Sequence, residues 1–444
     1  MTPVRRRACG AALRGLVLLG AAALADAQAA RLGEVLDMAR ASDAPYAAAR
    51  AAAQGGRERL PQARAAIRPS INLSYSLRRN RDGSSAFDDT LGYEASSAAL
   101  TVVQPVFRLL NKASIEQAEW QVQLVEQQLA FAEQDLLLRV ARGYFDVLQA
   151  QDELAAATAQ KDALAQQLAQ ARRSLEVGTV PVTDFNEAQT RHDLARAQEI
   201  ATRNELESKR RVLERIIARP LPPLAQLLPE AGVTLLDAEA QDALVEAAPR
   251  DALPVAIGRL AVDVATAEIA RREAGQHPTL DLFFTVGINR NTNYGRFGGT
   301  DTRQASIGLD LNFPVYQGGA VSSRTREAIA DRLRAEEELL NVQRQARLDA
   351  QQAQLGVQSG RALTEALTQA LRSAETQLRS TQRGLQVGVR TRVDVLNAEQ
   401  QLFATRRDLA AARYRTLVAA LQLKAAAGAL RETDLRALDA LLQD

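Results

Sequence analysis

Two stretches of the chain are free of proline over an unusually long distance. They span 111–176 and 321–386, and Ala, Leu, Gln, Arg and Glu dominate both. These residues favour helix, and at 1.5 Å per residue a run of about 66 residues gives a helix roughly 100 Å long. Such a helix is several times longer than an ordinary domain is wide, so the sequence predicts an elongated molecule.

Apolar residues in the first stretch recur at the spacing of a coiled-coil seam. They step mostly by three and four through Ile115, Ala118, Val122, Val125, Leu129, Ala132, Leu136 and Val140. This pattern is typical of helices packed side by side. We therefore expect the long helices to form antiparallel hairpins.

The second half of the chain echoes the first, which predicts an internal two-fold repeat. Arg68-Pro69-Ser70 matches His277-Pro278-Thr279, Gln104-Pro105-Val106-Phe107 matches Phe313-Pro314-Val315-Tyr316, and GTVPVTDFNEAQ from Gly178 matches GVRTRVDVLNAEQ from Gly388. Each half is expected to run helix, strand, strand, very long helix, turn and helix.

The predicted organisation follows from these matches. The first repeat spans 28–219, with a helix, strands at 70–80 and 97–107, a long helix at 111–177 and a helix at 184–218. The second spans 250–430, with a helix, strands at 279–289 and 304–314, a long helix at 321–387 and a helix at 394–428. Four prolines within 220–229 stop the preceding helix and open a linker at 220–249, and a tail occupies 431–444.

Residues 1–27 are interpreted as a cleaved export signal. Arginines at 5–7 precede a short apolar run at 16–24, and small residues allow cleavage after residue 27 or 29. The alternative is a buried N-terminal helix. The single cysteine, Cys9, lies before the apolar run, so the mature chain is expected to lack thiols and disulfides.

The four expected strands alternate apolar and polar residues, as Ile71, Leu73, Tyr75 and Leu77 do in the first. Polar, Gly-rich loops are expected between them, at 81–96 and 290–304. Each strand has about the ten residues of a tilted membrane-spanning strand. A water-soluble hairpin with one wet face would alternate in the same way. The export signal favours the membrane, and no other segment past the signal is long enough for a transmembrane helix.

Four strands are too few to close a membrane barrel, which needs about eight. An open sheet edge cannot face lipid, because its backbone groups would lack partners. If the strands cross a membrane, copies of the chain must pool them. The protein is therefore expected to be an oligomer with mainly helical protomers and a membrane β-region.

The residues that could carry catalysis or bind a metal are sparse. The two histidines, His192 and His277, lie far apart in sequence and have no metal-ligand partner at useful spacing. We find no phosphate-binding loop, no nucleophile elbow and no zinc-protease motif. The net charge of +2 lies entirely in the N-terminal arginines, which argues against nucleic acid binding. No enzyme activity, cofactor or metal is expected.

The repeated order of elements resembles the TolC family of outer-membrane efflux proteins. The motifs that carry the resemblance are Phe313-Pro314-Val315-Tyr316-Gln317-Gly318-Gly319 and the run Val387-Gly388-Val389-Arg390-Thr391-Arg392-Val393-Asp394. The resemblance implies a homotrimer in which each protomer gives four strands to a 12-stranded barrel in the outer membrane of a Gram-negative bacterium. Paired helices would form a tunnel through the periplasm.

By the same resemblance, the protein is a passive exit duct. It would dock through a periplasmic membrane-fusion (adaptor) protein on an inner-membrane ABC or RND transporter, for type I protein secretion or multidrug efflux. The sequence leaves the cargo open. A non-transporting periplasmic coiled-coil adaptor or scaffold is the alternative, and an exported hydrolase is disfavoured because no catalytic residues converge.

The resemblance also places a periplasmic gate. Arg390 matches the latch arginine of the family, Thr183 and Asp184 match its partners, and Asp394 matches an acidic ring at the entrance. The tip turns at Gly178-Thr179 and Gly388-Val389 would meet the adaptor. From the residues alone, Arg390 and Asp394 could equally be a turn residue and a helix-start carboxylate.

Two positions depart from the family pattern. Leu385 stands where a tyrosine is frequent, so one latch hydroxyl is missing. Asn397 replaces a second entrance acid, so a single acidic ring is expected.

Overall fold

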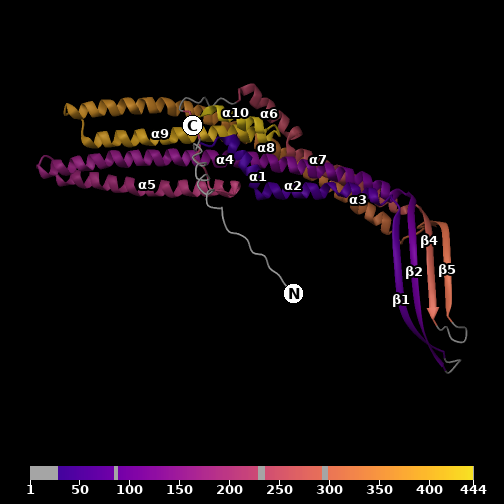
Figure 1. The fold of residues 1–444 in the computed structure, drawn as a ribbon. Coiled ribbons are helices and arrows are strands. Elements are labelled where there is room, and N and C mark those ends of the chain that lie inside the picture. Colours follow the sequence, from indigo (N-terminus) through magenta and orange to yellow (C-terminus); the bar gives the residue numbers. More distant parts are fainter. Residues whose placement is uncertain (1–28, 85–88, 229–235, 293–298, 444) are drawn as a thin grey trace, which may run out of the picture.

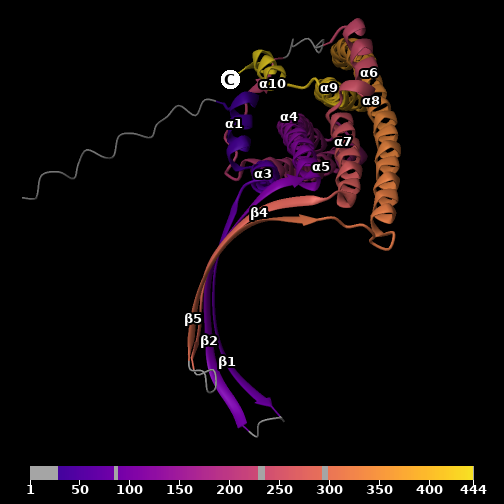
Figure 2. The same cartoon turned by 90° about the vertical axis from the view of Figure 1, so that its right-hand side faces the viewer.

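The structure, a computed structural model, describes residues 29–84, 89–228, 236–292 and 299–443. The expected signal segment at 1–27 lies outside the described residues. The molecule is long and narrow, with a sheet at one end that bends away from the helices and two helical tips at the other (Figures 1 and 2).

Two very long helices connect the two ends. α4 spans Leu109–Glu176 and α8 spans Ala320–Gln386, 68 and 67 residues long. Toward the tips, α4 pairs with α5 (Val182–Ile217) and α8 pairs with α9 (Arg392–Ala426). These four helices begin and end close to the expected bounds, because proline and glycine fix where they stop.

The halves of α4 and α8 nearer the sheet have other partners. α2 (Ala44–Arg57) and α3 (Arg59–Ala65) pack along α4, and α7 (Leu253–Glu273) packs on both α4 and α8. The short 3₁₀ turn Ala274–Gln276 then leads into the sheet. The single helix expected before the first strand pair is in fact three helices, since α1 (Leu32–Ser42) precedes α2 and α3.

A group of short segments, called here the belt, lies at the middle of the molecule, where segments distant in sequence meet (Figure 1). It contains α1, α6 (Ala238–Asp251), α10 (Glu432–Leu438), the 3₁₀ turn Asp439–Leu441 and the two-residue strands β3 (Gln226–Leu227) and β6 (Leu442–Gln443), which pair with each other. The largest apolar core lies here, around Tyr144, Phe145, Leu417 and Leu421. Both the expected linker and the expected tail therefore contribute to the core.

The sheet consists of β1 (Ser70–Ser84), β2 (Asp89–Arg108), β4 (Thr279–Thr292) and β5 (Thr300–Asn312). Their spatial order is β1-β2-β4-β5, and every neighbouring pair is antiparallel. The pairing of β2 with β4 joins the two hairpins into one sheet, with a register shift between Pro105 and Phe107.

The loops expected at 81–96 and 290–304 were wrong in extent. β1 and β2 stay paired out to Ser84 and Asp89, and β4 and β5 out to Asn291 and Thr300. Each predicted strand was ended at the residue where the apolar–polar alternation stops. Ladder hydrogen bonds use backbone groups, so pairing continues through polar residues.

The α8–α9 hairpin depends on a close approach at Gly360. A Cβ atom placed there would clash with the hydroxyl of Thr416, whose side chain is fully buried on α9. The α4–α5 hairpin has a similar contact, where a Cβ at Gly143 would lie 3.1 Å from Leu213. Glycine at these positions lets each helix pair pack closely along its length.

We predict that Gly360→Ala destabilises the protein although alanine favours helix. The clash with buried Thr416 should lower the free energy of unfolding by about 1–3 kcal/mol, the usual effect of overpacking. Thermal unfolding followed by circular dichroism in detergent would show a lower midpoint. The matched control is Gly55→Ala on α2, where a Cβ meets nothing within 4 Å and the midpoint should stay or rise. Equal shifts in the two variants would contradict the contact.

Candidate functional site

The four-stranded sheet has one apolar and one polar face. Cross-strand rows such as Leu73, Leu100, Val286 and Ala305 lie opposite one another in register, and the next row is Ile71, Val102, Phe284 and Ile307. These side chains cover no core, since Leu73 is 79% exposed and Ile307 is 74% exposed. On the other face, the Thr285 hydroxyl donates to that of Thr101 at 3.3 Å, and Ser76 and Ser97 are bonded at 2.8 Å.

Both outer strands leave one edge open. β1 pairs only with β2 and β5 pairs only with β4 among the described residues. Each edge therefore presents a row of backbone N–H and C=O groups that can pair with another strand. An apolar face flanked by two such edges is suited to closing with further copies of itself.

No helix among the described residues is both long and apolar enough to cross a membrane. The same residues contain no group of three or more side chains that could hold a metal ion. His192 lies 3.3 Å from Asp193 on α5, and His277 ends the 3₁₀ turn before β4.

The two hairpin tips are built alike. Gly178 and Gly388 have positive φ angles of 73° and 78°, which reverse the chain at little steric cost. The amide N–H of Thr179 donates to the Ser174 carbonyl, and that of Val389 donates to the Gly384 carbonyl, both at 2.9 Å. Thr179 and Val389 are exposed, so both turns present their residues to solvent.

Asp394 caps the start of α9. Its carboxylate accepts from the Thr391 amide at 2.9 Å, and its own amide donates to the Thr391 hydroxyl at 3.2 Å. This reciprocal pair satisfies two backbone donors at the helix terminus. The hydrogen bonds from Thr391 are the main cause that lowers the pKa of Asp394, with the nearby charge of Arg390 adding to it.

The expected latch residues come from both hairpin tips. Thr183 and Asp184 lie in the first turn of α5, with the Thr183 hydroxyl 3.4 Å from the Asp184 carboxylate. Arg390 is exposed in the turn between α8 and α9. Asp184 and Leu385 line one small cavity of about 120 Å³ between the tips. Within one chain the structure thus brings Asp184 to Leu385, and no hydrogen bond joins Arg390 to the described Thr183 or Asp184.

A seam between the two hairpins was missed by the sequence analysis. Gln167 on α4 donates to Glu399 on α9 at 2.5 Å, and Arg191 on α5 donates to Asn397 at 3.1 Å. Beside them pack Leu164, Ala195 and Leu396. Nothing in the sequence signals these contacts, because they join three helices whose relative rotation depends on the whole packing. Asn397 therefore has a structural partner in place of an entrance charge.

Closer to the belt, two buried side chains hold the seam. The Tyr414 hydroxyl on α9 donates to Asp152 on α4 at 2.8 Å, and the Gln134 amide donates to the Ala425 carbonyl at 2.8 Å. Burial is the main cause that raises the pKa of both Tyr414 and Asp152. The bond therefore joins the buried Tyr414 side chain to a half-buried acidic side chain across the seam.

A long helical body that carries an amphipathic, open-edged sheet defines the class of outer-membrane channel proteins. A family model described as "Outer membrane efflux protein" matches residues 35–219 and 244–429. The chain belongs to this family, as its motifs predicted, and it is an outer-membrane exit duct.

Relatives agree with this assignment, and solved structures share the fold. The chain is 31% identical to outer membrane protein TolC of Vibrio cholerae over 417 residues, 94% of each chain. It is 31% identical to the proteases secretion protein PrtF of Dickeya chrysanthemi over 433 residues, 94% of this chain and 92% of that one. The fold matches the Campylobacter jejuni CmeC outer membrane channel with a TM-score of 0.78 at 12% identity, over 90% of this chain and 86% of that one.

We predict that Asp394→Ala and Thr391→Ala each loosen the first turn of α9. Hydrogen exchange of the peptide 388–397, corrected for intrinsic rates, should become faster at neutral pH because the cap is lost. The folded pKa of Asp394 is lowered, so its stabilisation is present above the unfolded pKa and is lost as pH falls through the folded value. At acidic pH, the corrected exchange rate of the wild-type peptide should therefore approach that of the variants.

The control for this experiment is Asp408→Ala, on the same helix but paired with Arg407. It should leave exchange at the tip unchanged. Wild-type exchange rates in Asp394→Ala at neutral pH would show that the cap does not hold the helix start.

Proposed function

We propose that this chain is one protomer of a homotrimeric duct that passively conducts cargo from an inner-membrane transporter to the exterior. The observation that carries the proposal is the sheet with one apolar face and two open edges, at the end of helices roughly 100 Å long. Lipid satisfies no backbone hydrogen bond, so the edges must be paired inside a closed barrel. Three copies of four strands give a 12-stranded barrel, a size that membrane barrels adopt.

The helical body supports the same assembly. Contacts within the chain place α5 beside α4, α4 beside α9, and α9 beside α8, so α5 and α8 are the outer helices. α8 carries an exposed row of leucines, Leu333, Leu340, Leu348, Leu355 and Leu363, each between 43% and 62% exposed. The row repeats every seven or eight residues, as an apolar helix seam does. We infer that α8 of one copy packs against α5 of the next toward the tips and against its α2 nearer the sheet, closing a helical tunnel in the periplasm.

Energy for export would come from partners. We propose a periplasmic adaptor that meets the tip turns at Gly178-Thr179 and Gly388-Val389, and an inner-membrane ABC or RND transporter. The name of PrtF points to protein secretion and the family description points to efflux. Both cargo classes are compatible with the chain, and the role is transport without catalysis or a cofactor. A non-transporting adaptor or scaffold is not favoured, because it would leave the apolar sheet face exposed to water.

The hairpin tips are the proposed gate. Arg390 is exposed and near the mouth, where a guanidinium can bond the Thr183 hydroxyl and the Asp184 carboxylate of the same or a neighbouring copy. Three copies of Asp394 would form an acidic ring that favours cations. Leu385 offers no hydroxyl beside Asp184, so the latch would depend on Arg390.

We predict that paired cysteines on the two sheet edges link copies into a covalent trimer. Ser74→Cys on β1 would be combined in turn with Thr302→Cys, Gln304→Cys and Ser306→Cys on β5, all on the polar face. Neighbouring strands bring Cβ atoms within about 5.5 Å, close enough for a disulfide after small adjustment. Denaturing gels under oxidising conditions should show bands up to three chains in at least one combination.

Each single-cysteine variant is the control for this experiment and should form no three-chain band. Cleavage of the expected signal removes Cys9, so the mature chain should contain no thiol besides the introduced cysteines. Monomers across the whole scan, or bands of four chains, would contradict the proposed barrel.

We predict that Arg390→Ala and Asp184→Ala raise the resting conductance of the protein in planar bilayers. Each change removes one side of the proposed latch, so the tips should separate more readily. Arg372→Ala, an exposed arginine farther along α8, is the control and should conduct like the wild type. Wild-type conductance in both tip variants would exclude these residues from the gate.

We predict that Asp394→Asn lowers cation selectivity and weakens block by divalent cations. Asparagine keeps a side-chain oxygen for the Thr391 amide and removes the charge, so the cap is retained while the ring is lost. The reversal potential in a salt gradient measures the change. An unaltered reversal potential with unaltered block would leave Asp394 with its capping role alone.

A further inference from the structure

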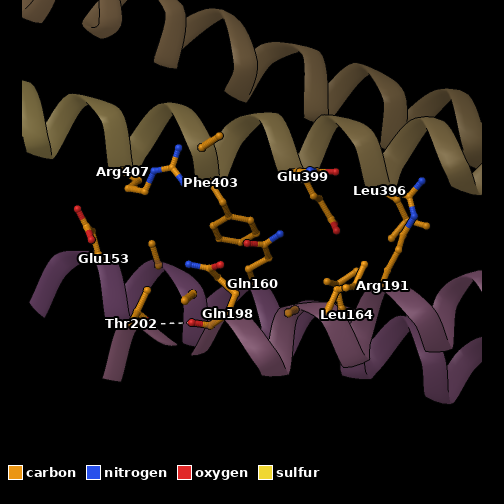
Figure 3. Close-up of a pocket in the computed structure, with 16 residues that line it drawn as sticks. Glu153, Gln160, Leu164, Arg191, Gln198, Thr202, Leu396, Glu399, Phe403 and Arg407 are labelled. Carbon is orange, nitrogen blue, oxygen red and sulfur yellow. Dashed lines mark hydrogen bonds between the residues drawn. The ribbon is translucent and has the colours of Figure 1, made fainter. Parts of the chain in front are cut away.

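The seam between the hairpins contains a cavity of about 300 Å³, called here the seam cavity. α4 and α5 form one wall, and α9 forms the other (Figure 3). It lies on the belt side of the bond between Gln167 and Glu399. Its volume is at the lower end of the range for sites that bind small molecules.

The cations in the wall of the seam cavity already have partners. Arg191 donates to Glu187 on its own helix, at 2.8 Å, and to Asn397 across the seam. Arg407 donates to the neighbouring Asp408 at 2.9 Å. Each guanidinium charge is therefore partly compensated by a carboxylate on its own helix.

Two carboxylates that line the seam cavity, one in each wall, have no cationic partner among the described residues. Glu399 accepts only from the amide of Gln167, and Glu153 accepts only from the amide of Gln149, at 2.8 Å. Glu399 is partly buried, and burial is the main cause that raises its pKa. A carboxylate held away from water without a cation is unfavourable. Glu399 is therefore the group whose charged form a bound cation would stabilise most.

An aromatic ring lies between these charges. Phe403 points from α9 into the seam cavity, toward Gln160 and Gln198 of the opposite wall (Figure 3). Leu164, Leu194 and Leu396 supply further apolar surface. The ring face can attract a cation and can also pack against an apolar group.

We propose that the seam cavity binds a small organic ammonium ion that carries an apolar group. The ammonium lies near Glu399, and the apolar group packs against Phe403 and the leucines. Such a ligand would contact α4, α5 and α9 together and stabilise one hairpin against the other. This proposal concerns binding to the wall of the molecule and does not depend on passage of cargo.

The test is titration of benzyltrimethylammonium chloride into the purified protein in a non-ionic detergent, followed by calorimetry. Saturable binding is expected. Phenylacetate, which has the same ring and a negative charge, should not bind, and benzyl alcohol should bind more weakly. This series uses the wild-type protein alone, so it decides the matter even if a variant fails to fold.

Variants then locate the site. Glu399→Gln retains a partner for Gln167 and removes the charge, so it should weaken binding by about tenfold, as expected for loss of one charge-assisted contact. Phe403→Leu should weaken binding about threefold or more through loss of the ring. Glu365→Gln makes the same charge change at an exposed position on α8 and should leave binding unchanged.

Three results would overturn the proposal. The first is no saturable binding of the ammonium ion to the wild type. The second is phenylacetate binding as well as the cation does, which would assign the cavity to Arg191 and Arg407. The third is a folded Glu399→Gln variant that binds like the wild type.

Discussion

An unpaired strand edge in lipid is the constraint on which the rest of the structure depends. β1 and β5 each leave one edge open, and the sheet between them turns an apolar face outward. In water such a sheet would aggregate, and in lipid its edge groups would lack hydrogen bonds. We therefore propose that the sheet closes with other copies, which would arrange the helices that leave it around a common axis.

The contacts between the hairpins change along that axis. Near the belt, the buried side chains of Tyr414 and Gln134 bond from one hairpin to the other, beside the largest apolar core. Toward the tips, the described residues of the two hairpins share one small apolar cluster and two polar bonds, with a cavity on either side. Regions with few buried apolar contacts open at lower free energy. The tips are therefore the part of the wall best suited to move, while the belt stays fixed.

The sequence predicted the features that depend on local pattern. Proline-free, Ala-rich runs specify α4 and α8, because helix propensity is high through both runs and the seam spacing from Ile115 to Val140 agrees with it. Alternation located the four strands but ended them too early, since the backbone pairing from Arg81 to Ser84 needs no apolar residues. The matching of Gly178 with Gly388 located both tips, because a positive φ angle at a helix end requires glycine or a close substitute.

Features that depend on packing between distant segments could not be read in the same way. The pairing of β3 with β6 joins Gln226 to Gln443, and neither two-residue segment has a strand pattern. The seam bond between Gln167 and Glu399 requires the rotation of two long helices to be known within a fraction of a turn. For function, Asp394 shows how far the sequence can be interpreted. The same carboxylate can cap a helix and also place charge at a pore entrance, and the sequence does not separate the two roles.

The most direct measurement of the central claim is the mass of the detergent-solubilised protein by native mass spectrometry. The full chain has a mass of 48.1 kDa. The account predicts a particle of three processed chains that persists in mild detergent, because each open edge is paired with the edge of a neighbour. A particle of one chain would contradict the account, since a single copy leaves both edges of its sheet exposed.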